Sequence, residues 1–338
     1  MLFRSTIHYP RYYYTPKIGR RWYHEFMWHS VKRTLSRGLD AFRPQAVLGY
    51  WTHPDGTVAV RYARQINAKA FVMVGGSDVL LTSPGSTRGR LVCSTLNAAD
   101  GVLSVSQDLH RRVMECGVPS ERVHLVYRGV DRTRFFPGDR SEARARLGLP
   151  SGPTLFLWVG RMVPVKGLDI LMQAAARLNR RGCFFELVMA GDGVERVRLE
   201  RMAGTLGLRN VVRFVGNVPH VDLPDWYRAA DWCVLSSHSE GVPNVLLEAH
   251  ACGTPFIATR VGGVAEIAVH GVDRMVPPGD PEGLAEHMAQ HVAISAVERD
   301  RLASRVLGLE TAAATIGALL QGKLQPTQAA NRPPVESR

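Results

Sequence analysis

The chain has 338 residues, 45% of them hydrophobic, and carries 42 Lys and Arg against 30 Asp and Glu, which gives a net charge of +12. This length suits about two domains, and the apolar content excludes a disordered chain. No run reaches the ~18 apolar residues of a membrane-spanning helix and the start lacks the apolar core of a signal peptide, so we expect a cytoplasmic protein.

Short apolar runs alternate with stretches of helical length along the chain. This alternation predicts an α/β fold of parallel sheets covered by helices on both faces. A doubly wound domain normally opens on a strand, a Gly-rich turn and a helix. No glycine precedes Gly19, so this opening unit is predicted to be missing from the first domain. Strands are predicted there at 46–51, 70–75, 101–105 and 123–127, with 3–9 as a candidate fifth.

The excess positive charge lies in the first part of the chain. Residues 1–147 contain 23 Lys and Arg against 11 Asp and Glu, whereas the remainder has 19 of each. A basic surface favours anionic partners such as nucleic acid, acidic lipid or phosphorylated substrates. Because aromatic side chains accompany the cations in 9–28, we interpret this face as a peripheral contact with anionic membrane rather than a nucleic-acid site. Ordinary packing of those aromatic residues is the alternative.

A segment rich in Gly and Pro at 136–153 separates the basic part from the neutral part. We therefore predict a first domain at 1–140, a second at 141–322 and a frayed tail at 323–338. In the second domain we predict strands at 154–160, 184–191, 211–216, 232–236 and 255–259, and helices at 167–180, 194–206, 244–252 and 297–320.

The cysteines and two further patterns are interpreted as unrelated to ligands. The five cysteines are widely spaced without a CxxC pair, which predicts reduced thiols rather than a disulfide framework or a zinc site. His287 and His291 are four residues apart but lack the glutamate of a zinc-protease helix. Gly191 and Gly193 are followed by Arg196 where a dinucleotide site needs a third glycine, so no NAD site is expected.

The first candidate binding segment is 159–167, where an apolar strand ends at Gly160 and a helix opens near Gly167. Ligands of open parallel sheets lie beyond the carboxyl ends of the strands. Arg161 and Lys166 therefore project where a diphosphate would lie, the Arg as a bidentate donor and the Lys as a point charge. The alternative is two solvated loop cations.

The second candidate segment is 236–253, which again follows a predicted strand. Pro243 suits the first turn of a helix, whose free N–H groups make an anion site. Glu240 in the loop and Glu248 on the helix can face one cleft, and carboxylates accept paired hydrogen bonds from the vicinal hydroxyls of a ribose or hexose. The alternative is one helix cap and one surface charge.

A third segment pairs Gly262 with Gly263 after a strand, which lets the backbone approach a ligand closely or simply makes a turn. In order and spacing, the three segments resemble the signature of glycosyltransferase family 4, retaining sugar transferases of the GT-B fold. The resemblance implies two Rossmann-like domains whose parallel sheets face a central cleft. Further matching pieces occur at 128–137, 190–193, 214–218 and 230–231.

The resemblance implies a role for each matching position. Arg161 and Lys166 would hold the donor diphosphate, Glu240 would face the donor sugar, and these three are the predicted catalytic residues. Glu248 would bind the ribose hydroxyls. The other predicted substrate-binding positions are Gly160, Val218 beside the base, Gly241, Asn244, Val245 and Leu246 at the phosphate, Gly262 and Gly263.

The first domain resembles the family in two places. Residues 50–56 are similar to an acceptor-side segment of relatives that build bacterial surface polysaccharides. Gly75, Ser77 and Asp78 occupy the family's His-Gly-Ser-Asp turn, with Gly75 where many members carry His, and are predicted to bind substrate. The family's opening strand and Gly-Gly loop, which lie beside the acceptor, are not visible in this sequence.

The resemblance therefore implies a glycosyltransferase that moves a sugar from a nucleotide-diphosphate donor to a glycan or lipid-linked acceptor in bacterial surface polysaccharide synthesis. Neither a metal nor another cofactor is expected, because the chain has no Asp-x-Asp and two cations with a helix terminus supply positive charge. The alternatives are a nucleotide-binding remnant or partner protein without transferase activity, and a nucleotide-sugar epimerase on the same architecture.

Overall fold

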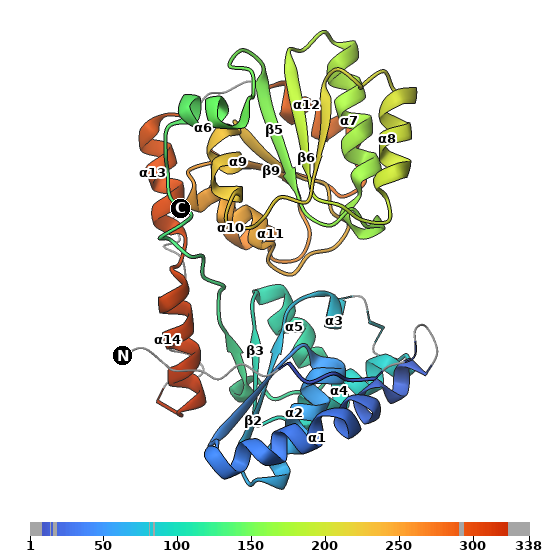
Figure 1. Cartoon of the computed structure of the whole chain (residues 1–338), viewed down its shortest axis with the longest axis vertical. Helices are drawn as coiled ribbons and strands as arrows, with labels where there is room; N and C mark the ends of the chain where they lie inside the picture. Colours follow the sequence, from blue (N-terminus) through green and yellow to red (C-terminus); the bar gives the residue numbers. More distant parts are fainter. Residues whose placement is uncertain are drawn as a thin grey trace. The chain divides into compact units, whose positions relative to one another are not determined.

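The computed structural model describes residues 9–13, 15, 19–80, 82–83, 85–290 and 294–323. Within this range the chain divides into two compact units (Figure 1). The first unit ends at Val126 and includes the end of the last helix from Gly317, and the second runs from Tyr127 to Ile316. Residues 3–8 of the candidate fifth strand and 324–338 of the predicted tail lie outside the described residues.

The first unit contains a four-stranded parallel sheet in the order β1-β2-β3-β4. Its strands are β1 (Ala46–Tyr50), β2 (Lys69–Val74), β3 (Gly101–Ser104) and β4 (Val123–Leu125), which confirms the four predicted strands. Within the described residues β1 is an edge strand, and it is less buried than β2 and β3. The helices of this unit are α1 (Tyr23–Ala41), α2 (Thr57–Gln65), α3 (Ser77–Leu80), α4 (Thr87–Ala98) and α5 (Gln107–Glu115).

Helix α1 packs against α2 through a small apolar cluster that contains Trp28, Val58 and Tyr62. The Tyr62 hydroxyl donates to the carbonyl of Leu35 at 3.1 Å, which fastens the two helices together. Of the aromatic residues in the predicted interfacial segment 9–28, Trp28 therefore belongs to the core. Tyr9, Tyr12, Tyr13 and Trp22 are exposed.

The second unit contains a six-stranded parallel sheet in the order β10-β9-β8-β5-β6-β7. This is the strand order of a doubly wound nucleotide-binding sheet. From β5 to β7 the strands are added toward one edge of the sheet, and from β8 to β10 they are added toward the other edge, so the order reverses between β5 and β8. The three-residue β10 was not predicted, because so short a strand leaves no apolar run. The strands are β5 (Thr154–Val159), β6 (Phe185–Ala190), β7 (Val212–Gly216), β8 (Trp232–Leu235), β9 (Phe256–Thr259) and β10 (Arg274–Val276).

Helices cover both faces of this sheet, and alternate residues of each strand supply the two layers of core. Phe156 and Trp158 of β5 pack with Leu171 on the face of α7, α8 and α12, while Leu155 and Leu157 are buried on the other face. The helices of this unit are α6 (Arg140–Leu147), α7 (Leu168–Arg180), α8 (Arg196–Thr205), α9 (Leu223–Ala229), α10 (Asn244–Ala251), α11 (Val264–Ile267), α12 (Pro281–Ala289) and α13 (Ala296–Arg305), followed by α14 (Leu309–Leu320).

The helix predicted at 297–320 is two helices in the structure, so that prediction is wrong. Residues between α13 and α14 pair with the segment that follows β4. Val130 N–H donates to the Leu307 carbonyl at 2.9 Å, and Leu309 N–H donates to the Val130 carbonyl at 2.9 Å. These two bonds, with the bridge between Val130 and Gly308, hold the backbone extended where a continuous helix would have to form.

The compact units divide at Val126, earlier than the predicted boundary at 140. The segment 127–139 packs on the second unit, because Arg228 donates hydrogen bonds to the carbonyls of Arg134 and Phe136. The Gly- and Pro-rich segment 136–153 therefore lies inside the second unit and not between the two units.

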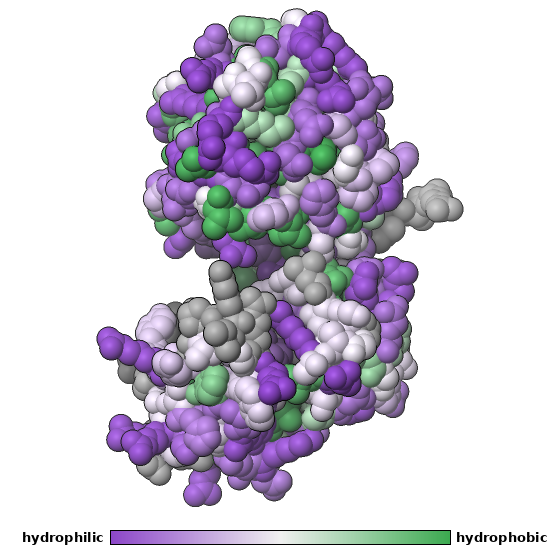
Figure 2. Space-filling model, turned by 90° about the vertical axis from the view of Figure 1, so that its right-hand side faces the viewer, coloured by the Kyte–Doolittle hydropathy of each residue, from purple (hydrophilic) through white to green (hydrophobic). Residues whose placement is uncertain are grey.

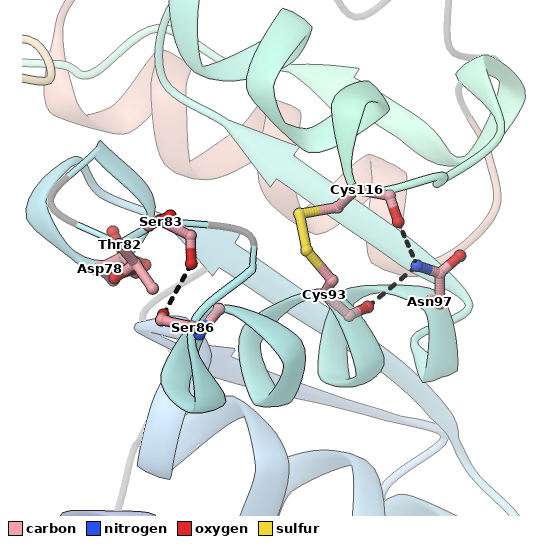
Figure 3. Close-up of a disulfide and its surroundings, with 8 residues drawn as sticks. Asp78, Thr82, Ser83, Ser86, Cys93, Asn97 and Cys116 are labelled. Atoms are coloured by element: carbon pink, nitrogen blue, oxygen red, sulfur yellow. Dashed lines mark hydrogen bonds between the residues drawn. A yellow bond between two sulfur atoms is a disulfide. The ribbon is translucent and has the colours of Figure 1, made fainter.

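The structure joins Cys93 on α4 to Cys116, the residue after α5, in a disulfide (Figure 3). The prediction that all five cysteines are reduced is therefore wrong for these two. A separation of 23 residues gives no sign in the sequence that two side chains meet. Asn97 strengthens the same junction, since its Nδ2 donates to the carbonyls of Cys93 and Cys116 at 2.9 and 2.8 Å. Cys183, Cys233 and Cys252 are free.

Breaking this disulfide is expected to destabilise the first unit by about 3 kcal/mol, the chain-entropy value for a loop of this length. Urea unfolding with and without dithiothreitol measures the change, and C93S/C116S is expected to match the reduced wild type. C183S, which removes a free thiol, is the control. Thiol titration of denatured protein should give three thiols without reductant and five with it. Five in both conditions would contradict the pairing.

Polar side chains predominate on the face shown in Figure 2, where the hydrophobic residues are scattered. Single exposed apolar residues of this kind are ordinary for a folded protein. Within the described ranges, every helix is too short or too polar to cross a membrane.

Candidate active site

The two candidate binding segments meet at the point of the second unit's sheet where the strand order reverses. Strands β5 and β8 are neighbours there, and the segments that begin at Gly160 and Ser236 leave their carboxyl ends. Ligands of doubly wound sheets bind at this reversal because the loops diverge and leave a crevice. The predicted catalytic residues therefore lie where this topology places a ligand.

Hydrogen bonds fasten these two loops to each other. Ser236 Oγ donates to the Lys166 carbonyl at 3.0 Å, and His238 N–H donates to the Val165 carbonyl at 2.8 Å. Gly167 allows the contact, since a Cβ there would lie 2.2 Å from the Ser236 carbonyl oxygen. The loops consequently hold Lys166 and Glu240 at a fixed distance although they are 74 positions apart in the sequence.

Lys166 and Glu240 form an ion pair at the carboxyl edge. Lys166 Nζ donates to Glu240 Oε1 at 2.6 Å, and Ser237 Oγ donates to the same oxygen at 2.6 Å. The Glu240 side chain is mostly buried. Both of these hydrogen bonds end on Oε1, and neither involves Oε2. The Arg161 side chain is exposed and makes no hydrogen bond or ion pair with any described residue. The site thus contains the guanidinium of Arg161, unpaired among the described residues, the ammonium of Lys166 in an ion pair, and the Glu240 carboxylate held by two hydrogen bonds.

Glu248 on α10 is nearly buried and already has two partners. The Tyr227 hydroxyl donates to Oε2 at 2.9 Å, and His220 Nε2 donates to Oε1 at 3.0 Å. Burial and the neighbouring Glu248 carboxylate raise the pKa of Tyr227, so it stays a neutral donor. The sequence predicted Glu248 to bind hydroxyls and gave no sign of these partners.

The start of α10 carries the residues predicted at the phosphate. Pro243 precedes the helix, and Asn244 is exposed with its Oδ1 accepting from Arg128 Nη1 at 3.2 Å. Val245 is half-buried and Leu246 is buried. The Leu246 N–H donates to the Pro243 carbonyl at 3.1 Å, so this one of the predicted phosphate donors is engaged within the first turn.

Gly262 and Gly263 support the loop that carries Glu240. Gly263 N–H donates to the Gly241 carbonyl at 2.7 Å. Gly262 has φ +50°, and a Cβ there would lie 1.8 Å from the Glu240 carbonyl oxygen. This glycine pair therefore allows a close approach of two backbone segments, since it contacts the backbone of Glu240 and Gly241.

Replacing Gly262 by alanine is expected to displace the Glu240 loop and to destabilise the second unit by about 1–3 kcal/mol, from the left-handed backbone and the forced shift. Gly279 provides a matched control, since its φ is +78° and a Cβ would meet nothing within 4 Å. Urea unfolding of G262A and G279A measures the difference. Equal losses would mean that only the backbone conformation matters, and that the contact with Glu240 does not.

The two remaining predicted positions of the second unit follow the strands β5 and β7. Gly160 has φ +154° and its N–H donates to the Ala190 carbonyl at 3.0 Å, where β5 ends. Val218 follows β7 and lines a cavity of about 540 Å³ together with Phe136, Trp226 and Arg146.

The predicted substrate-binding residues of the first unit follow β2. Asp78 is buried, and its carboxylate accepts from Thr52 N–H and Oγ1 at 3.2 and 3.0 Å. It also accepts from the N–H groups of Gly75 and Gly76, at 3.2 and 2.9 Å. Asp78 thus ties the Gly75–Asp78 turn to the segment after β1, and only Ser77 among these residues is exposed.

Sequence reasoning missed Ser237, His220 and Tyr227 as parts of the site. Ser237 was inside a candidate segment, but its bond to Glu240 depends on a three-residue turn that no pattern signals. His220 and Tyr227 lie 28 and 21 residues before Glu248. Only the path of residues 217–231, which connect β7 to β8, brings them to the carboxylate.

The part of the chain that the structure describes contains no group of three or more His, Cys, Asp or Glu side chains that could hold a metal ion. His287 lies on α12, and His291, four residues later, lies outside the described residues.

Two family models match the chain in succession. Residues 3–134 match the model described as Glycosyltransferase Family 4, and residues 139–305 match the model described as Glycosyl transferases group 1. Together they account for most of the chain, and the first match ends at residue 134, within the segment 127–139 that packs on the second unit.

The curated relatives are named D-inositol 3-phosphate glycosyltransferases. One from Catenulispora acidiphila is 40% identical over 198 residues, which cover 56% of this chain and 46% of the relative. Another from Frankia alni is 37% identical over 224 residues, which cover 63% of this chain and 50% of the relative. The chain spans about half the length of the curated relatives it matches.

Solved structures share the fold. Anabaena HepE in complex with UDP gives a TM-score of 0.73 at 24% identity, covering 87% of this chain and 82% of that one. Sucrose-phosphate synthase from Thermosynechococcus elongatus gives 0.77 at 24% identity, covering 91% and 80%. Both confirm the GT-B fold, with two α/β units that each contain a parallel sheet. With both family models matched and the strand-end signature assembled on a doubly wound sheet, the chain belongs to glycosyltransferase family 4.

Proposed function

We propose that this protein transfers a sugar from a nucleotide-diphosphate donor to an acceptor hydroxyl. The observation that carries the proposal is the combination of Arg161 with the Lys166–Glu240 pair at the sheet reversal. HepE, which shares the fold, has been solved with UDP and with UDP-glucose, so UDP is the first nucleotide to test.

The chemistry required of the site is charge stabilisation. As the bond between the sugar and the diphosphate breaks, negative charge grows on the leaving nucleotide and the sugar becomes oxocarbenium-like. Arg161 and Lys166 supply positive charge to the leaving group. Glu240, held by Lys166 and Ser237, faces the sugar, and Glu248 receives the ribose hydroxyls.

We further propose that the reaction retains the anomeric configuration and needs no metal, because two cations and the start of α10 supply the charge. Proton NMR of the product reports the anomer, and the same coupling constant in donor and product supports retention. Activity unchanged by EDTA supports metal independence, and loss restored by Mg²⁺ would contradict it.

The proposed acceptor is a glycan or a lipid-linked sugar of bacterial surface polysaccharide synthesis, presented at the inner face of an anionic membrane. The excess of basic residues before residue 147 and the exposed aromatics Tyr9, Tyr12 and Tyr13 support this placement. The curated relatives are named for inositol 3-phosphate, so that compound belongs in the same acceptor screen.

A thermal-shift titration with UDP, GDP and ADP, alone and as sugar conjugates, tests the donor site. A nucleotide at about 100 times its Kd should stabilise the fold by about 2.7 kcal/mol. The shift should be selective for one base and absent from the R161A/K166A variant. Donor consumption without an acceptor, with a changed sugar as product, would instead indicate an epimerase.

A nucleotide-binding protein without transferase activity is the second candidate. The observation in its favour is the four-stranded sheet of the first unit, where β1 is an edge strand within the described residues. Binding of nucleotide without turnover across the acceptor screen would support it. No shift with any nucleotide, in protein shown to be folded, would contradict both candidates.

A further inference from the structure

Glu248 has two hydrogen-bond partners that differ sharply in their surroundings. Tyr227 on α9 is fully buried and holds Oε2 from inside the unit. His220 lies in the loop after β7 and holds Oε1 from the open side. Its side chain is 59% exposed, whereas that of Glu248 is 11% exposed.

The His220 ring is itself positioned by the core. Its centroid lies 5.0 Å from that of Phe135, with the two rings tilted by 51°. Phe135 is buried and also lies against Tyr227, with ring centroids 6.1 Å apart. One buried aromatic ring therefore supports both partners of Glu248, so the exposed imidazole keeps a defined direction.

An ionised carboxylate accepts about four hydrogen bonds. How well it binds the two hydroxyls of a vicinal diol depends on the orientation of the carboxylate plane. Tyr227 alone fixes one oxygen and leaves rotation about the side-chain axis. A second donor on Oε1 stops that rotation and leaves one lone pair on each oxygen. Two free lone pairs with a fixed spacing match the two hydroxyls of a ribose.

We propose that His220 is a positioning residue for ribose recognition, which orients the Glu248 carboxylate toward the 2′ and 3′ hydroxyls of the donor nucleotide. The inference rests on the proposed function, because it assigns this residue to the same nucleotide site. Val218, predicted beside the base, is two residues before His220, so the same loop would contact base and ribose together. The diphosphate contacts of Arg161 and Lys166 do not involve His220.

Calorimetric titration with UDP and with 2′,3′-dideoxy-UDP separates the ribose contacts from the rest. Wild type should bind UDP more tightly than the dideoxy compound. H220A should lose about 10-fold in affinity for UDP and less than 2-fold for dideoxy-UDP. H220Q retains a side-chain N–H donor and should recover most of the loss. A merely structural role would weaken both nucleotides equally.

His270 supplies the matched control, since it is an exposed histidine of the same unit with no hydrogen bond or ion pair among the described residues. H270A should bind both nucleotides as the wild type does. Unchanged UDP affinity in H220A, or equal loss for both nucleotides, overturns the inference while the proposed function stands. Wild type that does not distinguish UDP from dideoxy-UDP also overturns it. The titration uses the nucleotide selected by the thermal shift, and wild type that binds none of UDP, GDP and ADP overturns the proposed function itself.

Discussion

Replacing Arg161 by alanine is expected to lower kcat by about 100-fold or more, the usual effect of removing one group that stabilises charge in the transition state. The guanidinium is exposed and has no partner among the described residues, so nothing in the folded protein depends on it. Urea unfolding should therefore be unchanged within about 0.5 kcal/mol. The separation of a large kinetic effect from a negligible structural one identifies a residue that acts on substrate.

Arg209 is the matched control for this experiment. It is exposed and precedes β7, so it lies at the edge of the sheet opposite to the ligand site. R209A should keep wild-type kcat, and R161K should recover part of the loss because the charge remains without the bidentate geometry. If R161A kept full turnover, Arg161 would not hold the diphosphate, and the proposed chemistry would have to rely on Lys166 alone.

Replacing Asp231 by alanine is expected to destabilise the second unit by about 3–5 kcal/mol, the cost of leaving a buried charge unpaired. The Arg144 side chain is only 7% exposed and donates to Asp231 Oδ2 at 2.6 Å. Arg140 pairs with the other oxygen, and Leu155 N–H donates to Oδ2 at 2.8 Å. Asp231 therefore joins α6 to the start of β5 just before β8 begins.

Arg144 cannot simply turn to solvent when Asp231 is removed. Its Nε donates to the Ala229 carbonyl at 2.9 Å and its Nη1 to the Ser151 carbonyl at 3.0 Å, so it is held inside the unit. E282A is the matched control, because Glu282 pairs with Arg177 and Arg181 but is half exposed, and its loss should cost less than about 1 kcal/mol. Urea unfolding measures both. Equal small losses would show that Asp231 is solvated rather than buried.

Much of the fold could be read from local patterns. The β5 and β6 strands were predicted because apolar residues buried on both faces make continuous runs, and each prediction ran one residue long at Gly160 and Gly191. Those glycines have φ of +154° and +141°, so the backbone leaves the ladder there. The placement of the motif residues at the strand ends could also be predicted, because the segments that follow parallel strands leave the same edge of the sheet.

The sequence by itself determined the α/β alternation, the strand-end placement of Arg161, Lys166 and Glu240, and the family. These features depend on the periodicity of neighbouring residues and on fixed spacings, which need no knowledge of distant contacts. Only the tertiary structure decided that Cys93 meets Cys116 and that His220 and Tyr227 hold Glu248. Such pairs join residues more than 20 positions apart, and their meeting depends on the order of strands in the sheet and on which face each connecting helix covers.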